Sequence, residues 1–285
     1  MKPSVLNKLT CPVCSASGSP MNSLRAVTAK KNGGSPALFC RNCRSHFPAI
    51  HSIINLAPDS PEPVIFSTQW AMEFAPLVAV YDNIWRPILT SIISDLGWEM
   101  KTSKQLMNVS SGMDILDLAC GTGNFTELFS DPAEPVDIIG ADLSMPMLEH
   151  AGRNMQARGI HNVTLIRADA ANWPFAPESF DRIHCAGALH LLPDVQNVFH
   201  SIYRSLKKER VSWALPISGE VITRLKSSKP WYPVRIGFTG SINRSCGIFP
   251  QEQALPNGKS EPISRALSSR FRKRRQREGE ATVVP

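Results

Sequence analysis

A stretch of 13 residues near the middle of the chain constrains its fold more than any other. Residues 113–125 read Met-Asp-Ile-Leu-Asp-Leu-Ala-Cys-Gly-Thr-Gly-Asn-Phe. The apolar run Ile115–Ala119 predicts a buried strand, the glycines end it, and a helix is expected from Asn124. Gly121 and Gly123 can adopt backbone angles closed to other residues and let a ligand approach the main chain. Strand, glycine turn and helix form the nucleotide site of open α/β sheets, and the alternative interpretation is an ordinary tight turn.

Three further apolar runs follow at the spacing of β-α units. Val136–Ala141 is followed by Asp142, which lies 19 residues beyond Gly123. An acid about 20 residues after a glycine turn, at the tip of the next strand, can accept both hydroxyls of a ribose. The third run ends just before Asp169, and the fourth covers residues 180–187. We therefore predict an α/β fold with a Rossmann-like parallel sheet and helices on both faces.

Several segments show the spacing of apolar residues that is typical of amphipathic helices. The pattern predicts helices over 144–158 and over 193–206, and a further helical segment over 74–93 that Pro87 bends or breaks. Tyr81 lies in that last segment and is a candidate to face a cofactor or substrate. The alternative for Tyr81 is ordinary core packing.

Four short sequences carry a family resemblance. DLACGTG, GADLS, RADA and FDRIHCAGALHLLPD, which end the successive strands or follow them, together resemble the class I methyltransferases that use S-adenosylmethionine. The likeness extends to the methyltransferase type 11 branch, which contains the quinone-biosynthesis C-methyltransferases, and it covers about residues 81–206. Ala119 departs from the pattern, because many members have their first glycine there.

The resemblance implies a set of site residues. The glycine turn would hold the amino-acid portion of S-adenosylmethionine, Asp142 the ribose, and Asp169 the adenine amino group. His190 follows the fourth strand and is a candidate general base, with Tyr81 as the second candidate catalytic residue. The alternatives are helix caps for the two aspartates and a core position for His190. The implied cofactor-binding residues are Asp117, Ala119, Cys120, Gly121, Thr122, Gly123, Asp142, Leu143, Met145, Asp169 and Ala170.

A dinucleotide-binding fold is the main rival interpretation. A dehydrogenase would show Gly-x-Gly-x-x-Gly, whereas Asn124, Phe125 and Thr126 follow Gly123 without a third glycine. Asp117, directly before the turn, also suits a cationic sulfonium cofactor better than a pyrophosphate, which it would repel.

Two Cys-x-x-Cys pairs indicate a metal site near the N-terminus. Cys11 and Cys14 are separated from Cys40 and Cys43 by 25 residues. Each pair can form a knuckle, and two knuckles supply a closed tetrahedral zinc site without an open catalytic position. We predict structural zinc bound by these four thiolates, with unmetallated and redox-active turns as the alternative. A zinc ribbon before a methyltransferase domain resembles the layout of bacterial 23S rRNA guanine-N1 methyltransferases, although their ribbon is more compact.

Composition divides the chain into four predicted parts: a zinc-ribbon module over 1–56, a proline-containing linker over 57–68, the methyltransferase domain over 69–215, and an irregular or disordered basic tail over 216–285. Residues 207–285 carry 16 Lys and Arg against 6 Asp and Glu, so the net charge of +7 comes from the tail. The fifth strand of the sheet is expected as a short segment ending at Pro216. No closing hairpin is recognisable after it, so the C-terminal part of the sheet is expected to be incomplete.

These features together predict an S-adenosylmethionine-dependent methyltransferase of a small, apolar acceptor. RNA stays open as an alternative acceptor because of the zinc ribbon. A second alternative is an inactive homologue that binds zinc and nucleic acid, with the basic run 270–277 contacting nucleic acid or acidic surfaces. No apolar run is long enough for a membrane span, and the N-terminus lacks a signal-peptide pattern, so we expect a cytoplasmic protein.

Overall fold

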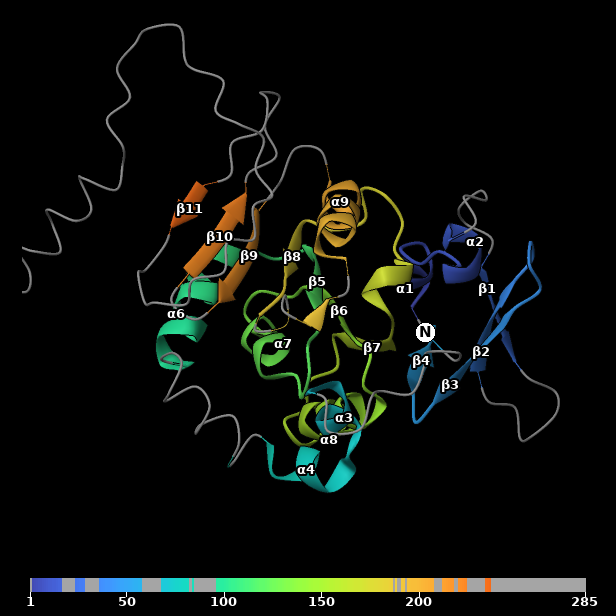
Figure 1. Ribbon diagram of the computed structural model, residues 1–285, viewed down its shortest axis with the longest axis horizontal. Helices are drawn as coiled ribbons and strands as arrows, with labels where there is room; N and C mark the ends of the chain where they lie inside the picture. Colours follow the sequence, from blue (N-terminus) through green and yellow to red (C-terminus); the bar gives the residue numbers. More distant parts are fainter. Residues whose placement is uncertain are drawn as a thin grey trace, which may run out of the picture. The chain divides into compact units, whose positions relative to one another are not determined.

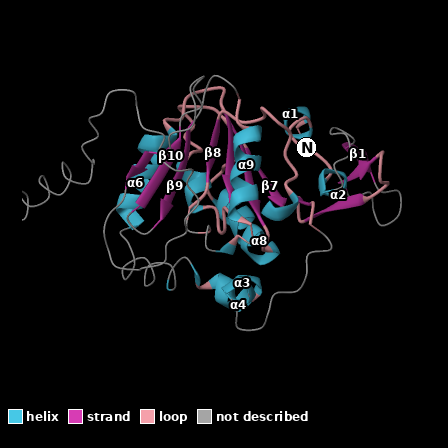
Figure 2. Ribbon diagram, turned by 45° about the horizontal axis from the view of Figure 1, so that its top comes forward, coloured by secondary structure: helices cyan, strands magenta, loops and turns pink. Residues whose placement is uncertain are grey.

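The computed structural model describes residues 2–16, 24–28, 36–57, 68–81, 84, 96–186, 188, 191–192, 194–207, 212–217, 220–224 and 234–236. These residues form one mixed sheet with the strand order β1-β2-β3-β4-β7-β6-β5-β8-β9-β10-β11. Figures 1 and 2 show the strands of this sheet side by side, with helices packed against it.

The middle of the sheet is parallel. Its strands are β5 (Asp114–Leu118), β6 (Asp137–Asp142), β7 (Val163–Arg167) and β8 (Arg182–His184). The chain runs outward from β5 through β6 to β7 and then returns to the other side of β5 at β8. This reversal makes the carboxyl end of β5 the topological switch point, where open α/β sheets bind their ligands.

The predicted strands and helices around this switch point are confirmed. The helix after the glycine turn is α7 (Asn124–Leu128), and the segment predicted over 144–158 is α8 (Met145–Ala157), with the Ser144 side chain accepting from the backbone N–H of Met147 as its N-cap. The segment predicted over 193–206 is α9 (Val195–Ser205). Buried apolar residues at α8 positions 147, 148, 151 and 155 explain why the helical period was readable from the sequence.

Three described helices lie between residues 68 and 107, before β5. They are α3 (Thr68–Glu73), α4 (Ala75–Ala79) and α6 (Leu96–Met107). Both α3 and α4 contact α8, and the three helices lie together in Figure 1. Residues 85–93 of the helical segment predicted over 74–93 and most of the linker predicted over 57–68 lie outside the described residues.

The N-terminal residues 2–57, which we call the cysteine module, are joined to the parallel sheet. The module contains α1 (Pro3–Leu6), α2 (Pro12–Ala16), β1 (Leu24–Thr28), β2 (Pro36–Cys40), β3 (His46–Ile50) and β4 (Ile53–Asn55). Its first three strand pairs are antiparallel, and β4 then pairs with β7 in parallel. One cluster of buried side chains runs from Phe47 and Ile54 of the module to Ile166 and Ile183 of the central sheet. The module and the central sheet therefore share a hydrophobic core.

The expectation of an incomplete sheet at the C-terminal side is wrong. Strand β9 (Ser212–Ile217) pairs with β8 in parallel, and β10 (Glu220–Arg224) and β11 (Val234–Ile236) continue as an antiparallel meander. Strand β9 also extends through Pro216, where the sequence pattern ended it. Two residues separate β9 from β10, which is a connection typical of hairpins. The short fifth strand was expected, but β10 and β11 were missed because they are short and lie among polar and proline-rich residues.

No helix among the described residues is long and apolar enough to cross a membrane. The basic run 270–277 and all residues after 236 lie outside the described part of the chain.

Candidate functional site

The glycine turn at the end of β5 has the backbone geometry that a ligand-binding turn requires. Ala119, Gly121 and Gly123 have φ angles of +55°, +54° and +86°. Left-handed backbone is costly for residues that carry a Cβ, which explains why glycine is common at the position that Ala119 occupies. The turn is closed by two bonds, from the N–H of Gly123 to the carbonyl of Cys120 (3.0 Å) and from the N–H of Cys120 to the carbonyl of Ala141 (3.1 Å).

The two glycines have different surroundings. A Cβ built on Gly123 would lie 2.6 Å from Cε of Met155 and 3.2 Å from Cβ of Ala151, both on α8. A Cβ built on Gly121 would meet no atom within 4 Å. Gly123 therefore packs tightly against α8, and a side chain there would have to displace Met155 and press on Ala151. Gly121 instead leaves an open side at which a ligand can reach the main chain.

Asp142 ends β6 and is bonded to the glycine turn. Its Oδ2 accepts from the N–H of Gly121 at 2.8 Å, and its Oδ1 accepts from the N–H of Ser144 at 2.9 Å. Burial raises the pKa of Asp142 and the charge of Asp117 acts in the same direction, against backbone N–H donors that lower it. An ionised carboxylate has about four acceptor sites, so the backbone N–H groups of Gly121, Ser144 and Leu143 leave part of its capacity for ligand hydroxyl groups.

Asp117 faces the interior of the protein. Its Oδ1 lies 2.8 Å from Nδ1 of His184, and its Oδ2 accepts from Oγ1 of Thr126 at 2.5 Å. Nε2 of His184 lies 3.2 Å from Oγ of Ser103, and all four side chains are buried. The network joins β5, β8, α6 and α7 directly beneath the turn. The observed bonds of Asp117 to Thr126 and His184 stabilise the packing of the elements around the turn. A direct contact between Asp117 and the cofactor stays a prediction.

The other predicted cofactor residues lie at the same end of the strands. Asp169 follows β7 and caps the short helix η2 (Ala170–Asn172) by accepting from the N–H of Ala171 at 2.9 Å. This is the capping role weighed as its alternative, and contact with adenine stays a prediction. Met145 begins α8 and packs against a small buried cluster that contains Leu148. The carbonyl of Leu143 accepts from Nε of Arg167 at 2.8 Å.

The predicted catalytic residues fall at the margin of the described structure. Tyr81 is half-buried just after α4, and His190 lies outside the described residues. Helix α3 is fixed to the edge that carries Asp142, because Oγ of Ser144 donates to the carbonyl of Met72 at 2.6 Å. Beyond α3, Phe74, Val80 and Ile84 are exposed, and so is Leu191 after the fourth parallel strand. Large apolar side chains are thus presented to solvent on both segments that carry the candidate catalytic residues Tyr81 and His190.

The four cysteines of the module converge. Their Sγ atoms all lie within 4.8 Å of one another, with Cys11 and Cys43 at 3.5 Å and Cys14 and Cys40 at 3.6 Å. These spacings are far longer than a disulfide bond and suit a tetrahedral ion with bonds of about 2.3 Å to sulfur. Burial raises the pKa of Cys11 and of Cys14, whereas bonds with Ser45 outweigh burial at Cys43 and lower its pKa. The donor set fits zinc.

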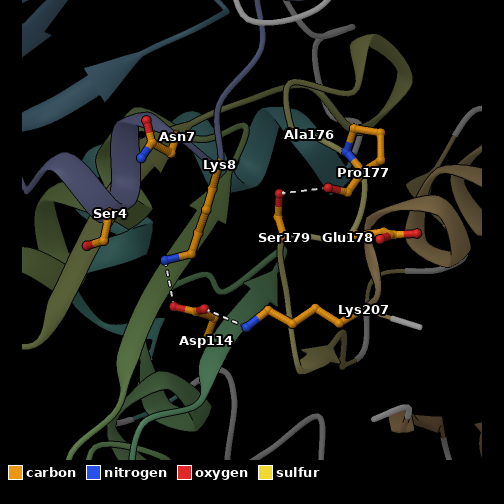
Figure 3. A pocket seen from close by; sticks show the side chains of 9 residues that line it. All are labelled: Ser4, Asn7, Lys8, Asp114, Ala176, Pro177, Glu178, Ser179 and Lys207. Atoms are coloured by element: carbon orange, nitrogen blue, oxygen red, sulfur yellow. Dashed lines mark hydrogen bonds and ion pairs between the residues drawn. The ribbon is translucent and has the colours of Figure 1, made fainter. Parts of the chain in front are cut away.

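The described structure also has a surface cavity of about 480 Å³ at the opposite, amino end of the strands. Figure 3 shows Lys8 and Lys207 reaching Asp114 from two sides of it. Their Nζ atoms lie 2.6 and 2.8 Å from the Asp114 carboxylate, and Lys207 also lies 2.7 Å from Asp181. The charges here are already paired within the protein, so this cavity is not the candidate cofactor site.

Sequence reasoning missed two residues that organise the candidate site. His184 lies within the fourth apolar run, whereas the sequence pattern favoured His190, which follows the strand. Arg167 begins the RADA segment, two residues before Asp169, and its charge at the end of the strand was the available signal.

Comparisons with known proteins find similar sequences over the part of the chain that contains this site. Residues 115–209 match the family model of methyltransferase domains. The demethylmenaquinone methyltransferase of Geobacillus stearothermophilus is 32% identical over 149 residues, covering 51% of this chain and 61% of that enzyme. That of Listeria monocytogenes is 32% identical over 123 residues, covering 42% and 52%. The chain thus spans about half to three-fifths of the length of these curated relatives.

Solved structures are also similar. The YcgJ protein of Bacillus subtilis is 31% identical with a TM-score of 0.37, covering 42% of this chain and 48% of that one. A SAM-dependent methyltransferase of Aquifex aeolicus is 18% identical with a TM-score of 0.41, covering 50% and 71%. The family match and the relatives thus show that residues 115–209 are similar to methyltransferase domains.

Proposed function

We propose that this chain binds S-adenosylmethionine at the carboxyl end of β5 and β6 and transfers its methyl group to a small, apolar acceptor. One observation carries the proposal. Asp142 lies at the topological switch point, 2.8 Å from the N–H of Gly121, with only neutral backbone donors as its described hydrogen-bond partners. A ribose could then bind to the carboxylate while the rest of the cofactor passes the open side of Gly121.

The chemistry requires little of the protein beyond binding and orientation. The cofactor supplies an activated methyl group, which an acceptor atom attacks in line. In our proposal the ribose hydroxyls donate to Asp142, and Asp169 accepts from the adenine amino group. The network of Asp117 and His184 keeps the turn in its binding conformation. Tyr81 and His190 are proposed to orient the acceptor and to take up its proton.

Two features support an apolar acceptor. Exposed Phe74, Val80 and Ile84 follow α3, which is bonded to the start of α8, and such side chains are commonly found where apolar ligands bind. The matched relatives are named for demethylmenaquinone, an apolar quinone. A demethylated naphthoquinone with a short side chain is therefore the first acceptor to assay, with an rRNA fragment as the comparison. Methylation of the RNA alone would contradict the proposed acceptor class.

Calorimetry with S-adenosylhomocysteine tests the cofactor site. We expect micromolar affinity for the parent protein and at least about a 100-fold loss for Asp142→Asn, because two charge-assisted bonds to the ribose are weakened. Asp137 begins the same strand and forms an ion pair with Lys2 at the opposite edge, so Asp137→Asn is the matched control. Equal affinity of both variants would remove Asp142 from the site.

We further propose that Cys11, Cys14, Cys40 and Cys43 bind structural zinc. The convergence of four thiol groups in a small module supports this, since zinc thiolate sites commonly stabilise modules with few apolar residues. Elemental analysis should find stoichiometric zinc in the parent protein and none after Cys40→Ser. Cys185→Ser is the matched control, because Cys185 is buried but is not one of the four converging cysteines. A metal-free parent protein that is folded with reduced thiols would contradict the proposal.

A further inference from the structure

We infer that Arg167 is a positioning residue that couples the cysteine module to the cofactor-binding edge, so that metal bound by the four cysteines tightens cofactor binding. The inference rests on the proposed function, because it takes Asp142 as the ribose-binding residue.

The side chain of Arg167 bridges two main-chain carbonyls from distant parts of the chain. Its Nη1 donates to the carbonyl of Ala57 at 3.0 Å, and its Nε donates to the carbonyl of Leu143 at 2.8 Å. Ala57 is the last described residue of the cysteine module, and Leu143 directly follows Asp142. A planar guanidinium holds two acceptors in a fixed relation, so the position of one carbonyl constrains the position of the other.

The backbone of Arg167 is fixed by the same two partners. On one side it pairs with Asn55 of β4, and its carbonyl accepts from the N–H of Leu56 at 2.9 Å. On the other side it pairs with Asp142 of β6. The main-chain carbonyl of Asp142 accepts from the N–H of Ala168 at 2.9 Å. Arg167 is therefore the contact point between the module's last strand and the end of the strand that carries Asp142.

Charge adds to this coupling. Glu73 at the end of α3 is partly buried, which raises its pKa, while the charge of Arg167 lowers the pKa and that of Asp142 raises it. Arg167 is thus close enough to interact electrostatically with the carboxylate of Glu73 on α3. Loss of the guanidinium would leave Glu73 and Asp142 to repel each other more strongly.

Metal binding bears on Arg167 because the cysteine cluster shares the core that positions β4. Cys11, Cys14 and Cys40 are buried in the same cluster of side chains as Phe47 of β3 and Ile54 of β4. Without a metal, the four thiol groups are held together only by packing and by weak hydrogen bonds to sulfur, such as that from Asn42 to Cys14. We therefore expect loss of metal to make β4 and the Ala57 carbonyl more mobile. The Arg167 side chain, which donates to that carbonyl, would then hold the carbonyl of Leu143 less firmly.

The experiment measures the affinity for S-adenosylhomocysteine by calorimetry, with zinc content and circular dichroism recorded on each sample. Arg167→Gln in the zinc-loaded protein should raise Kd about tenfold and leave the zinc content unchanged. Arg167→Lys keeps the charge but can reach only one carbonyl, so it should raise Kd about threefold. Unchanged Kd in Arg167→Gln would overturn the inference.

Arg182 provides the matched control. It also lies on a parallel strand, and its Nε and Nη1 donate to the carbonyls of Met107 and Asp181, but at the amino end of the sheet. Arg182→Gln should lower the unfolding temperature at least as much as Arg167→Gln and leave Kd within twofold of the parent. A tenfold rise of Kd in both variants would show that general destabilisation, and not positioning, weakens binding.

Chelation of zinc completes the test. In the parent protein it should raise Kd about tenfold with the far-ultraviolet spectrum preserved, whereas in Arg167→Gln it should raise Kd less than twofold further, because the bridge is already lost. An equal effect of chelation in both proteins, or collapse of the parent fold, would overturn the coupling. Absence of any binding by the zinc-loaded parent would instead contradict the proposed function itself.

Discussion

The carboxylates at the amino and carboxyl edges of the parallel sheet have different kinds of partner. At the amino edge, Asp137 pairs with Lys2, and Asp114 is held between Lys8 and Lys207. At the carboxyl edge, the described partners of Asp142 are backbone N–H groups. No ion pair is found between Asp142 and any lysine or arginine among the described residues.

This difference separates a structural edge from a binding edge. A carboxylate paired with lysine stabilises the fold and has little attraction left for a ligand. A carboxylate that is held only by neutral donors keeps its charge and has lone pairs left for a ligand. Its donors offset only part of the solvation free energy that the charge loses on burial. The raised pKa of Asp142 is the signature of that cost, and perturbed groups of this kind concentrate at functional sites.

The largest expected effects come from the two glycines of the turn. Gly123→Ala should lower the free energy of unfolding by about 2–4 kcal/mol, because a left-handed residue then also clashes with α8. Gly121→Ala should cost only about 1 kcal/mol of stability but weaken S-adenosylhomocysteine binding at least about 30-fold. Denaturant titration and calorimetry on the same samples separate the effects. Tight binding by Gly121→Ala would mean that the cofactor does not pass this side of the turn.

The amino edge is expected to respond to mutation in stability alone. Burial tends to lower the pKa of Lys207, but bonds with Asp114 and Asp181 outweigh it and raise the pKa. A raised lysine pKa means that the pairing stabilises the fold below the unfolded value of about 10.4 and is lost as the pH rises through the folded pKa. Because the Lys207 side chain is more than a third exposed, solvent screens this pairing. Lys207→Met should therefore cost about 0.5–1 kcal/mol at neutral pH and less at strongly alkaline pH.

Lys101 is exposed on α6 and serves as the control for Lys207. Lys101→Met should leave both the free energy of unfolding and its pH dependence unchanged. The cofactor affinity of Lys207→Met should equal that of the parent protein. A loss of cofactor affinity in Lys207→Met would contradict the assignment of a purely structural role to the amino edge.

The carboxyl edge should respond to acid. The pKa of Asp142 is raised above its usual value near 4, and we expect the ionised form to accept the ribose hydroxyls. Affinity for S-adenosylhomocysteine should therefore be constant at neutral pH and fall as the pH drops through this raised pKa, by at most about tenfold per pH unit. Asp142→Asn should bind weakly with a flat profile over that range. A flat profile in the parent protein would indicate that protonation of Asp142 does not matter for binding.

Much of the fold and part of the candidate site could be predicted from sequence because the signals are local. Apolar runs, the glycine turn and the 3.6-residue period each lie within a few residues, and β5, β6, β7 and α8 follow them closely. The pairing of β4 with β7 joins segments more than 100 residues apart, and no local pattern specifies it. Arg167 and His184 were missed for the same reason, since their roles depend on partners such as Ala57 and Ser103 from distant segments.

Ala119 provides the smallest and most specific test of the turn. Its φ of +55° costs an alanine about 1–2 kcal/mol relative to right-handed backbone, and glycine would avoid that cost while losing about 0.4–1 kcal/mol through greater freedom of the unfolded chain. Ala119→Gly should thus stabilise the protein by about 0.5 kcal/mol in denaturant titration.

The control for Ala119 is Ala151, which lies inside α8 in right-handed backbone. Ala151→Gly should destabilise the protein by about 1 kcal/mol, so the two substitutions have opposite signs. Cofactor affinity should be unchanged or slightly improved in Ala119→Gly, because the turn keeps its conformation with less strain. If both variants were destabilised equally, the left-handed conformation of Ala119 would be wrong, and so would the description of the turn as preformed for a ligand.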